Sequence, residues 1–368
     1  MDLAFLHPLY EHPGPWASVY VDTSRHTDST PRELSLAARS LSRELAGQGA
    51  DEPTCRAVRD MVEELGHAPE PYGRAMFARA GEVVLDPPLV AAPPDTSAQW
   101  SPLPHTAPLL QLAGEDPVCV VAYIDRKGAE FELRGALGSR EAGQAAGQQW
   151  PLHRTTTWDW SVRHFQLRVE NTWEHNAAEI ADALAVCQEE TRADLVVLVG
   201  EERERHAVRE RLPQRLGERV AEASHGAGSR LLDEDVERIR NEHVRRRAEQ
   251  ELERFLAARA PDEQGRARAV EGVPAVVEAA REHFIDELLI EPDGPDTHRE
   301  VWVGEDPDLL AVRRNELMSL GEEHAWPARA DDALVRSVVE TGAEAISVTA
   351  PTARDAPTGG VGALLRWA

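Results

Sequence analysis

The residues that could do chemistry lie in a glycine- and glutamine-rich segment near the middle of the chain. This segment, 135–157, contains Ala145–Gln149 with the sequence AAGQQ. Glycine permits backbone angles and close approaches that other residues do not, and a glutamine amide can hold a water molecule. An enzyme built on this segment would use Gln148 to order a water, and Asp159 would assist.

Aromatic and arginine side chains within and just after this segment could contact RNA. Trp158 and Trp160 could stack on bases, while nearby arginines could bind phosphate groups. The candidate arginines are Arg154, Arg163 and Arg168. A solvent-exposed loop that is packed by its own tryptophans explains these features equally well.

A long amphipathic helix is expected directly after the tryptophans. Arg163 and Arg168 lie near its expected start, where the helix N-terminus adds a partial positive charge. Apolar residues recur at helical spacing and predict a buried stripe at Phe165, Val169, Trp173, Ala177, Ile180 and Leu184.

Motifs for other chemistries are missing from the sequence. There is no P-loop and no G-x-S-x-G, and no pair of histidines has the spacing of a zinc-binding helix beside a catalytic glutamate. Cys55, Cys119 and Cys187 are far apart, so we expect buried free thiols in a reducing cytoplasm. We therefore expect neither a metal nor a cofactor.

The overall charge argues against a nucleic-acid partner, with one qualification. The net charge is -25, and binding to phosphates needs cations. Lys127 is the single lysine, so the other basic residues are arginines, which bind phosphate in a bidentate manner. GC-rich coding explains the same bias. No apolar run is long enough to span a membrane and the N-terminus does not resemble a signal peptide, so we expect a cytoplasmic protein without a membrane partner.

The pattern of strands and helices predicts an α/β protein of three domains. The first, 1–114, is expected to hold a strand, two helices and a hairpin, at Ser18–Ser24, Pro31–Ala46, Cys55–Gly66 and around Ala80–Gly81. The second, 115–225, is expected to hold a hairpin, the glycine- and glutamine-rich loop, the long helix and a buried strand at Ala193–Gly200.

The third domain, 226–368, is predicted to be an α/β/α sandwich because helices alternate with buried strands. A long charged helix opens it and ends before Pro261. Further along, Pro307–Gly321 is expected to form one helix, and a second helix is expected at Ala330–Gly342.

The stretch Trp160–Leu184 resembles the segment that follows the Gly-Gly-Gln motif in archaeal and eukaryotic class-1 peptide-chain release factors. It is more similar still to bacterial members of that superfamily, through Trp160, Ser161, Gln166, Glu170, Asn171, Trp173, Asn176 and Ala177. Ala330–Val348 and Gly360–Trp367 also resemble the third domain of these proteins. The resemblance implies a three-domain release-factor or Pelota-like architecture, whose third domain is similar to the kink-turn-binding ribosomal protein fold.

One departure from the family changes the expected function. In release factors, the Gly-Gly-Gln loop reaches the peptidyl-transferase centre and positions water against the ester. Those three positions align with Trp158, Asp159 and Trp160, so neither glycine nor the glutamine is kept. A displaced substitute through Gln148 is the minor alternative. The first domain also lacks a clear Asn-Ile-Lys-Ser motif, so stop-codon reading is not expected.

Three functions remain. The first, implied by a resemblance to Balon-type hibernation factors, is a non-catalytic ribosome-binding translation factor. It would occupy the A site in hibernation or stress, contact rRNA, and could come with elongation factor Tu. The second is a peptidyl-tRNA hydrolase or rescue factor of the Vms type, which would use Gln148 and Asp159. The third is an acidic protein-interaction module.

Overall fold

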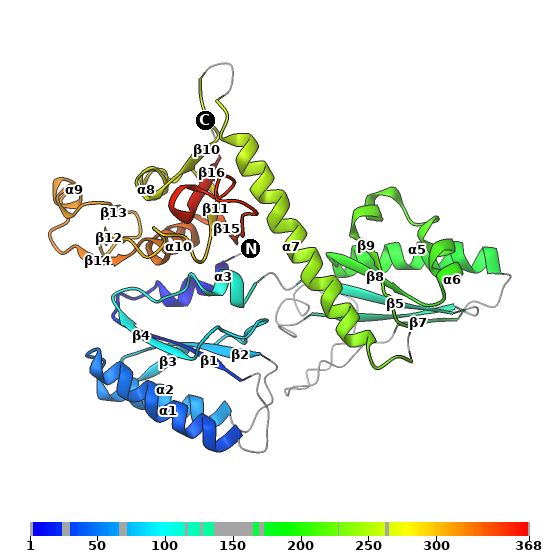
Figure 1. Cartoon of the computed structure of the whole chain (residues 1–368), viewed down its shortest axis with the longest axis horizontal. Helices are drawn as coiled ribbons and strands as arrows, with labels where there is room; N and C mark the ends of the chain where they lie inside the picture. The colour runs from blue at the N-terminus through cyan, green and yellow to red at the C-terminus, as the bar shows by residue number, and fades with distance from the viewer. Residues whose placement is uncertain are drawn as a thin grey trace. The chain divides into compact units, whose positions relative to one another are not determined.

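The computed structural model forms two compact units (Figure 1). One unit joins Met1–Glu115 to Arg247–Ala368, and the other is Asp116–Arg246. The division falls inside helix α7 (Leu232–Ala258). The division into three domains stays a prediction. The structure describes residues 3–23, 30–65, 72–114, 117–125, 128–135, 165–168, 173–226, 228–261 and 265–366.

The N-terminal part of the first unit is an antiparallel sheet with helices on one face. The strand order is β3-β2-β1-β4. The strands are β1 (Trp16–Asp22), β2 (Gly73–Arg79), β3 (Glu82–Leu85) and β4 (Ser97–Ser101). The helices α1 (Thr30–Gly47) and α2 (Glu52–Glu64) cover one face of this sheet (Figure 1).

The expected hairpin at Ala80–Gly81 is confirmed, and its turn is tied to α2. Ala80 and Gly81 have φ values of 46° and 84°, as a two-residue turn between twisted strands requires. The amide of Gly81 donates to Thr54 Oγ1 at 2.9 Å, and the Thr54 amide donates to the carboxylate of Asp51, which caps α2. The turn and the helix start therefore stabilise each other.

The C-terminal part of the first unit confirms the α/β/α sandwich. Its sheet has the order β10-β16-β11-β15, from Ala269–Glu271, Val361–Leu365, Ile285–Ile290 and Glu344–Ser347. The helices α8 (Val273–Arg281) and α10 (Ala330–Thr341) pack on one face. The second half of α7 packs on the other face through Leu252 and Phe255.

The expected helix at Pro307–Gly321 is wrong in its first half. Residues Leu310–Ala311 form strand β13, which pairs with β12 (Glu300–Val303), and only α9 (Arg314–Ser319) is helical. Leu310 and Ala311 are buried when they pair with β12. Pairing therefore overrides helical propensity here. The third strand of this small sheet is β14 (Trp326–Arg329).

A continuous hydrophobic core joins the N-terminal and C-terminal parts of the first unit. The 3₁₀ helix η1 (Ala4–Leu9) and the short helix α3 (Leu109–Leu112) contribute their leucines to the same cluster as α8 and α10. Burial of this apolar surface is the main force that holds the two parts together.

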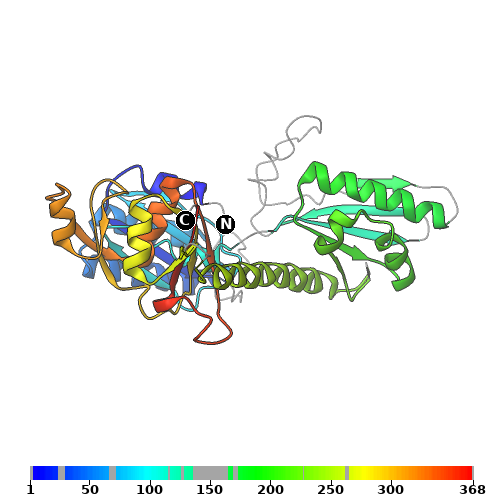
Figure 2. The same cartoon turned by 90° about the horizontal axis from the view of Figure 1, so that it is seen from above.

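The second unit is a five-stranded mixed sheet with helices on both faces. Its order is β7-β6-β5-β8-β9, from Phe165–Arg168, Gly128–Arg134, Cys119–Asp125, Leu195–Val199 and Val220–Glu222. The helices α5 (Trp173–Thr191) and α6 (Glu202–Arg209) cover one face, as Figure 2 shows for α5. The first half of α7 packs on the other face.

The long helix after the tryptophans starts later than the sequence predicted. Phe165–Arg168 is strand β7, paired antiparallel with β6, so Phe165 does not belong to a helical stripe and Arg168 does not lie at a helix start. Apolar and polar residues alternate over these four positions, which is the period of a strand. The later part of the stripe is confirmed, because Ala177, Ile180 and Leu184 are fully buried on α5.

The three cysteines are free and buried, as expected. Burial raises the pKa of the Cys119 thiol to about 12 and that of Cys187 to about 11, so these thiols stay protonated and inert. Among the helices in the described ranges, none has the length and apolar character that crossing a bilayer requires.

Candidate functional site

The long connection between β6 and β7 is the feature of the second unit that stands out. The two strands are antiparallel neighbours, with Phe131 opposite Phe165. Antiparallel neighbours are ordinarily joined by a loop of roughly two to five residues. Here the whole of residues 135–164 lies between the end of β6 and the start of β7. Long insertions of this kind on a rigid sheet often carry function.

A buried polar network stabilises the end of β6, from which this connection starts. We call this point the root of the connection. Arg134 is the last residue of β6, and its Nε and Nη2 atoms donate to the Glu132 carboxylate at 2.7 and 3.1 Å. Nη2 also donates to Tyr123 Oη at 2.8 Å, and Nη1 donates to Asp233 on α7 at 2.7 Å. One guanidinium therefore links two adjacent strands and a helix.

Electrostatics favour this network as a structural anchor. Glu132 is 5% exposed and also accepts the Tyr123 hydroxyl. Burial, followed by the hydrogen bond to Glu132, raises the pKa of Tyr123 to about 12. Burial alone would lower the pKa of Arg134, but its hydrogen bonds to Glu132 and Asp233 raise it above the ordinary value. The tyrosine stays neutral and the arginine stays charged at any physiological pH.

The residues predicted to act in this region are not brought together by the described structure. Arg154, Trp158, Trp160 and Arg163 lie outside the described residues, as do the alternative catalytic pair Gln148 and Asp159. The backbone of Arg168 pairs with Gly128 at the end of β7. The proposed roles of these residues stay predictions.

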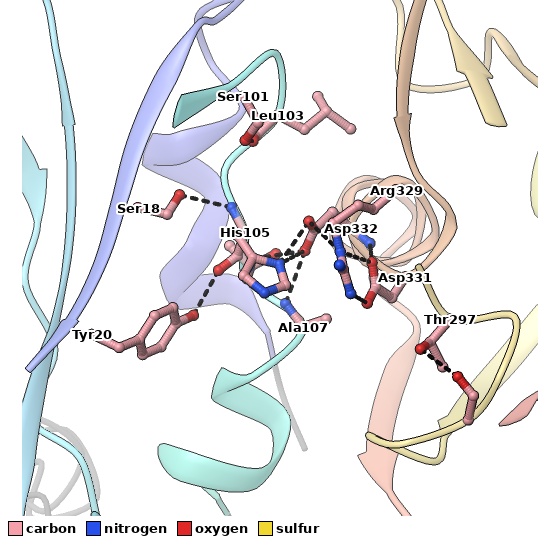
Figure 3. Close-up of polar contacts among 12 residues, drawn as sticks. Ser18, Tyr20, Ser101, Leu103, His105, Ala107, Thr297, Arg329, Asp331 and Asp332 are labelled. Atoms are coloured by element: carbon pink, nitrogen blue, oxygen red, sulfur yellow. Dashed lines mark hydrogen bonds and ion pairs between the residues drawn. The ribbon is translucent and has the colours of Figure 1, made fainter. Parts of the chain in front are cut away.

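A second polar cluster lies in the first unit, where the segment before α3 meets the start of α10 (Figure 3). His105 Nδ1 lies 2.8 Å from Asp332 Oδ2. The amides of Thr106 and Ala107 donate to Asp332 Oδ1 at 2.9 and 3.1 Å. Asp332 is 2% exposed, so all of these contacts are shielded from water.

Strand β1 holds the histidine from its other side. The His105 amide donates to Ser18 Oγ at 2.8 Å, and the Tyr20 hydroxyl donates to the His105 carbonyl at 2.6 Å (Figure 3). Burial alone would lower the pKa of His105, but the Asp332 carboxylate raises it above the ordinary value. The cluster therefore connects the two parts of the first unit through a charge-assisted contact.

The same cluster has the composition of a metal site but not its free ligand atoms. His105, Asp331 and Asp332 offer ligand atoms that lie within 4.8 Å of one another. However, Asp332 already accepts three N–H donors, and Asp331 accepts Arg329 Nε and Nη2 at 3.0 and 2.6 Å. A cation would have to displace these donors, so we interpret the arrangement as a structural contact between two segments. We call the contact of Asp332 with His105 and with the amides of Thr106 and Ala107 the clasp.

Sequence reasoning missed both polar clusters. Asp331 and Asp332 stand at the start of α10, where acidic residues ordinarily complement the helix dipole. One signal was available in the sequence. The two aspartates are adjacent in the first turn of a helix with an apolar stripe, so at least one of the two is expected to lie near the buried face. His105 gave no signal, because its partner lies 227 residues away.

Comparisons with known proteins show to which family the chain belongs. A model of the bacterial archaeo-eukaryotic release factor family 2 matches residues 118–261. Two proteins of Mycobacterium tuberculosis, uncharacterized protein Rv2629 of strain H37Rv and uncharacterized protein MT2704 of strain CDC 1551, are each 30% identical to the chain over 359 residues. The match covers 96% of this chain and 94% of each relative. The chain belongs to the bacterial archaeo-eukaryotic release factors.

Solved structures of archaeal and yeast proteins match this chain at low identity. Archaeoglobus fulgidus Pelota matches with 16% identity and a TM-score of 0.38, over 80% of this chain and 79% of that protein. An archaeal Pelota from a ribosome-bound model with ABCE1 matches with 14% identity and a TM-score of 0.38, over 98% and 93%. Saccharomyces cerevisiae Dom34 matches with 11% identity and a TM-score of 0.34, over 68% and 63%.

Proposed function

We propose that this protein is a cytoplasmic, ribosome-binding translation factor that occupies the A site during hibernation or stress and does not hydrolyse peptidyl-tRNA. The observation that carries the proposal is the long connection 135–164, which is rooted in a buried ionic anchor and lacks a Gly-Gly-Gln sequence. Arg154, Trp158, Trp160, Arg163 and Arg168 would contact rRNA, and elongation factor Tu would be a second partner.

The anchor supports a positional role for this connection. A loop that must reach a distant site needs a rigid base, because its tip moves with its root. Arg134 ties the root to both Glu132 and α7. A binding loop needs this support as much as a catalytic one, so the anchor is consistent with a factor that has kept the placement without the chemistry.

A competition experiment tests the proposed site. Purified ribosomes with a vacant A site would be mixed with the protein and pelleted through sucrose, alongside ribosomes whose A site holds tRNA. The proposal predicts co-sedimentation with the vacant ribosomes and its reduction by A-site tRNA. Equal binding to both would contradict an A-site location.

A hydrolysis assay on the same complexes separates binding from catalysis. Ribosomes carrying labelled peptidyl-tRNA would be incubated with excess protein, and released peptide would be counted. We expect release at the background rate. Release above background that is lost in Gln148→Ala or Asp159→Asn would instead establish the hydrolase function. Absence of any ribosome binding would favour an acidic protein-interaction module.

A further inference from the structure

Helix α1 carries a stripe of exposed arginines on the side opposite its buried face. Arg32, Arg39 and Arg43 recur at the spacing of one helix face, and all three are exposed. Leu36 lies in the same stripe and is 58% exposed. The opposite face packs into the core through Leu34, Ala38, Leu41 and Leu45. We name Arg32, Arg39 and Arg43 the α1 arginine stripe.

The α1 arginine stripe has no acidic partner in the part of the chain that the structure describes. The sequence places no carboxylate three or four residues before or after Arg39 or Arg43. Asp28 stands four residues before Arg32 and lies outside the described residues. Within the stripe, Arg43 Nε donates to the Arg39 backbone carbonyl at 3.1 Å. Arg39 and Arg43 are therefore exposed and form no ion pair with a described carboxylate.

The arginines of α7 show what the ordinary arrangement in this chain is. Arg238, Arg240, Arg245 and Arg254 each pair with a carboxylate three residues earlier, at 2.6, 2.7, 2.6 and 3.0 Å. On α1, by contrast, Arg39 and Arg43 stand one turn apart with like charge. Such a pair destabilises a helix by about 0.2–0.5 kcal/mol. An unpaired cationic row in a chain of net charge -25 therefore indicates a ligand outside the chain.

We propose that the α1 arginine stripe binds the phosphodiester backbone of RNA. The stripe spans about 16 Å along the helix, at 1.5 Å per residue, so its guanidinium groups can contact several successive phosphates. Guanidinium groups bind phosphate in a bidentate manner and are less strongly hydrated than ammonium groups. Leu36 lies between the arginines and can contact ribose. The identification of this RNA as ribosomal rests on the proposed function.

A matched pair of variants tests the stripe in the full-length protein. Arg39→Gln/Arg43→Gln removes two unpaired arginines. Arg56→Gln/Arg59→Gln removes the same charge from α2, where both arginines pair with carboxylates, Arg56 with Glu52 and Arg59 with Asp60. Binding to purified ribosomes and to deproteinised ribosomal RNA would be measured between about 50 and 200 mM salt, the range over which phosphate contacts weaken.

We expect the α1 variant to weaken binding to both ligands by about tenfold and to lower the salt slope by about 2, close to one per phosphate contact. The α2 variant should bind like the wild type. Thermal unfolding should show that the α1 variant is at least as stable as the wild type, because a like-charge pair has been removed.

Each other outcome overturns a defined claim. Equal losses of binding in both variants would show an effect of net charge and would refute a specific role of the stripe. No loss in either variant would refute RNA binding by the stripe but would not contradict the proposed function. Stripe-dependent binding to ribosomes but not to deproteinised RNA would identify a ribosomal protein as the partner. Stripe-dependent binding to RNA alone would keep the stripe and refute the proposed function. Binding to neither by the wild type would refute both.

Discussion

His105 Nδ1 and Asp332 Oδ2 lie 2.8 Å apart and join two segments that are 227 residues apart in the sequence. The histidine follows β4 in the N-terminal part of the first unit, and the aspartate opens α10 in the C-terminal part. Around this contact, two backbone amides share the same carboxylate. The first unit is therefore held together by a buried ionic clasp as well as by its apolar core.

Removing the carboxylate should strongly destabilise the first unit. Asp332→Ala leaves His105 and the amides of Thr106 and Ala107 without their acceptor in a buried setting. We expect the free energy of unfolding to fall by about 3 kcal/mol, as for other broken buried ion pairs. Urea denaturation of the full chain measures this. Asp293→Ala, in an exposed turn, is the control and should change stability by less than about 0.5 kcal/mol.

The clasp should also make stability depend on pH. The folded-state pKa of His105 is raised, so its charged form is favoured in the native protein. Its stabilising contribution is fully present below the unfolded pKa of about 6.5 and is lost as the pH rises through the folded value. The difference in urea midpoint between wild type and His105→Gln should therefore be larger at pH 6 than at pH 9. A constant difference across this range would contradict a charged histidine.

Neutralising a buried glutamate in the C-terminal sheet should increase stability at alkaline pH, in contrast to the loss expected for His105→Gln. Burial, followed by a hydrogen bond with Glu251, raises the pKa of Glu287 well above its ordinary range. The folded state then holds a proton that the unfolded chain releases, so stability falls as the pH rises above the unfolded pKa. We expect Glu287→Gln to be more stable than wild type by about 1 kcal/mol at pH 8 and similar near pH 4.5. Lower stability of the variant at pH 8 would refute a protonated Glu287.

The anchor at the root of 135–164 should matter for both stability and ribosome binding. Arg134→Gln leaves the buried Glu132 without its cation and should cost about 3 kcal/mol. Tyr123→Phe removes one hydrogen bond and should cost about 1 kcal/mol. Hydrogen exchange on β5 and β6 measures the loss locally. Arg215→Gln breaks an exposed pair with Glu189 and should change neither exchange nor ribosome affinity.

Local features of the fold could be predicted because their physical causes are local. Ala80 and Gly81 turn a hairpin because the flanking residues alternate and glycine tolerates positive φ. Ala177, Ile180 and Leu184 are buried because helical spacing places them on one face. Phe165 was misassigned because its spacing to later apolar residues fits a helix, whereas pairing with Phe131 makes it part of a strand.

The polar clusters could not be predicted because their partners come from distant segments. Arg134 meets Asp233, 99 residues later, and His105 meets Asp332. Sequence separations this long follow no helix or strand period. The residues around Arg134 and His105 also look like ordinary charged surface residues in the sequence. The α1 arginine stripe, in contrast, can be identified from the sequence once α1 is assigned, because its spacing and the lack of a carboxylate one turn away from Arg39 and Arg43 are local facts.

Sedimentation with ribosomes tests the central claim most directly. The purified protein would be mixed with ribosomes at low and moderate salt, with and without elongation factor Tu, and pelleted through sucrose. Ribosome binding through arginine–phosphate contacts predicts a pellet that contains the protein at low salt and less of it at moderate salt. Protein that stays in the supernatant at low salt, even with elongation factor Tu present, would contradict the account.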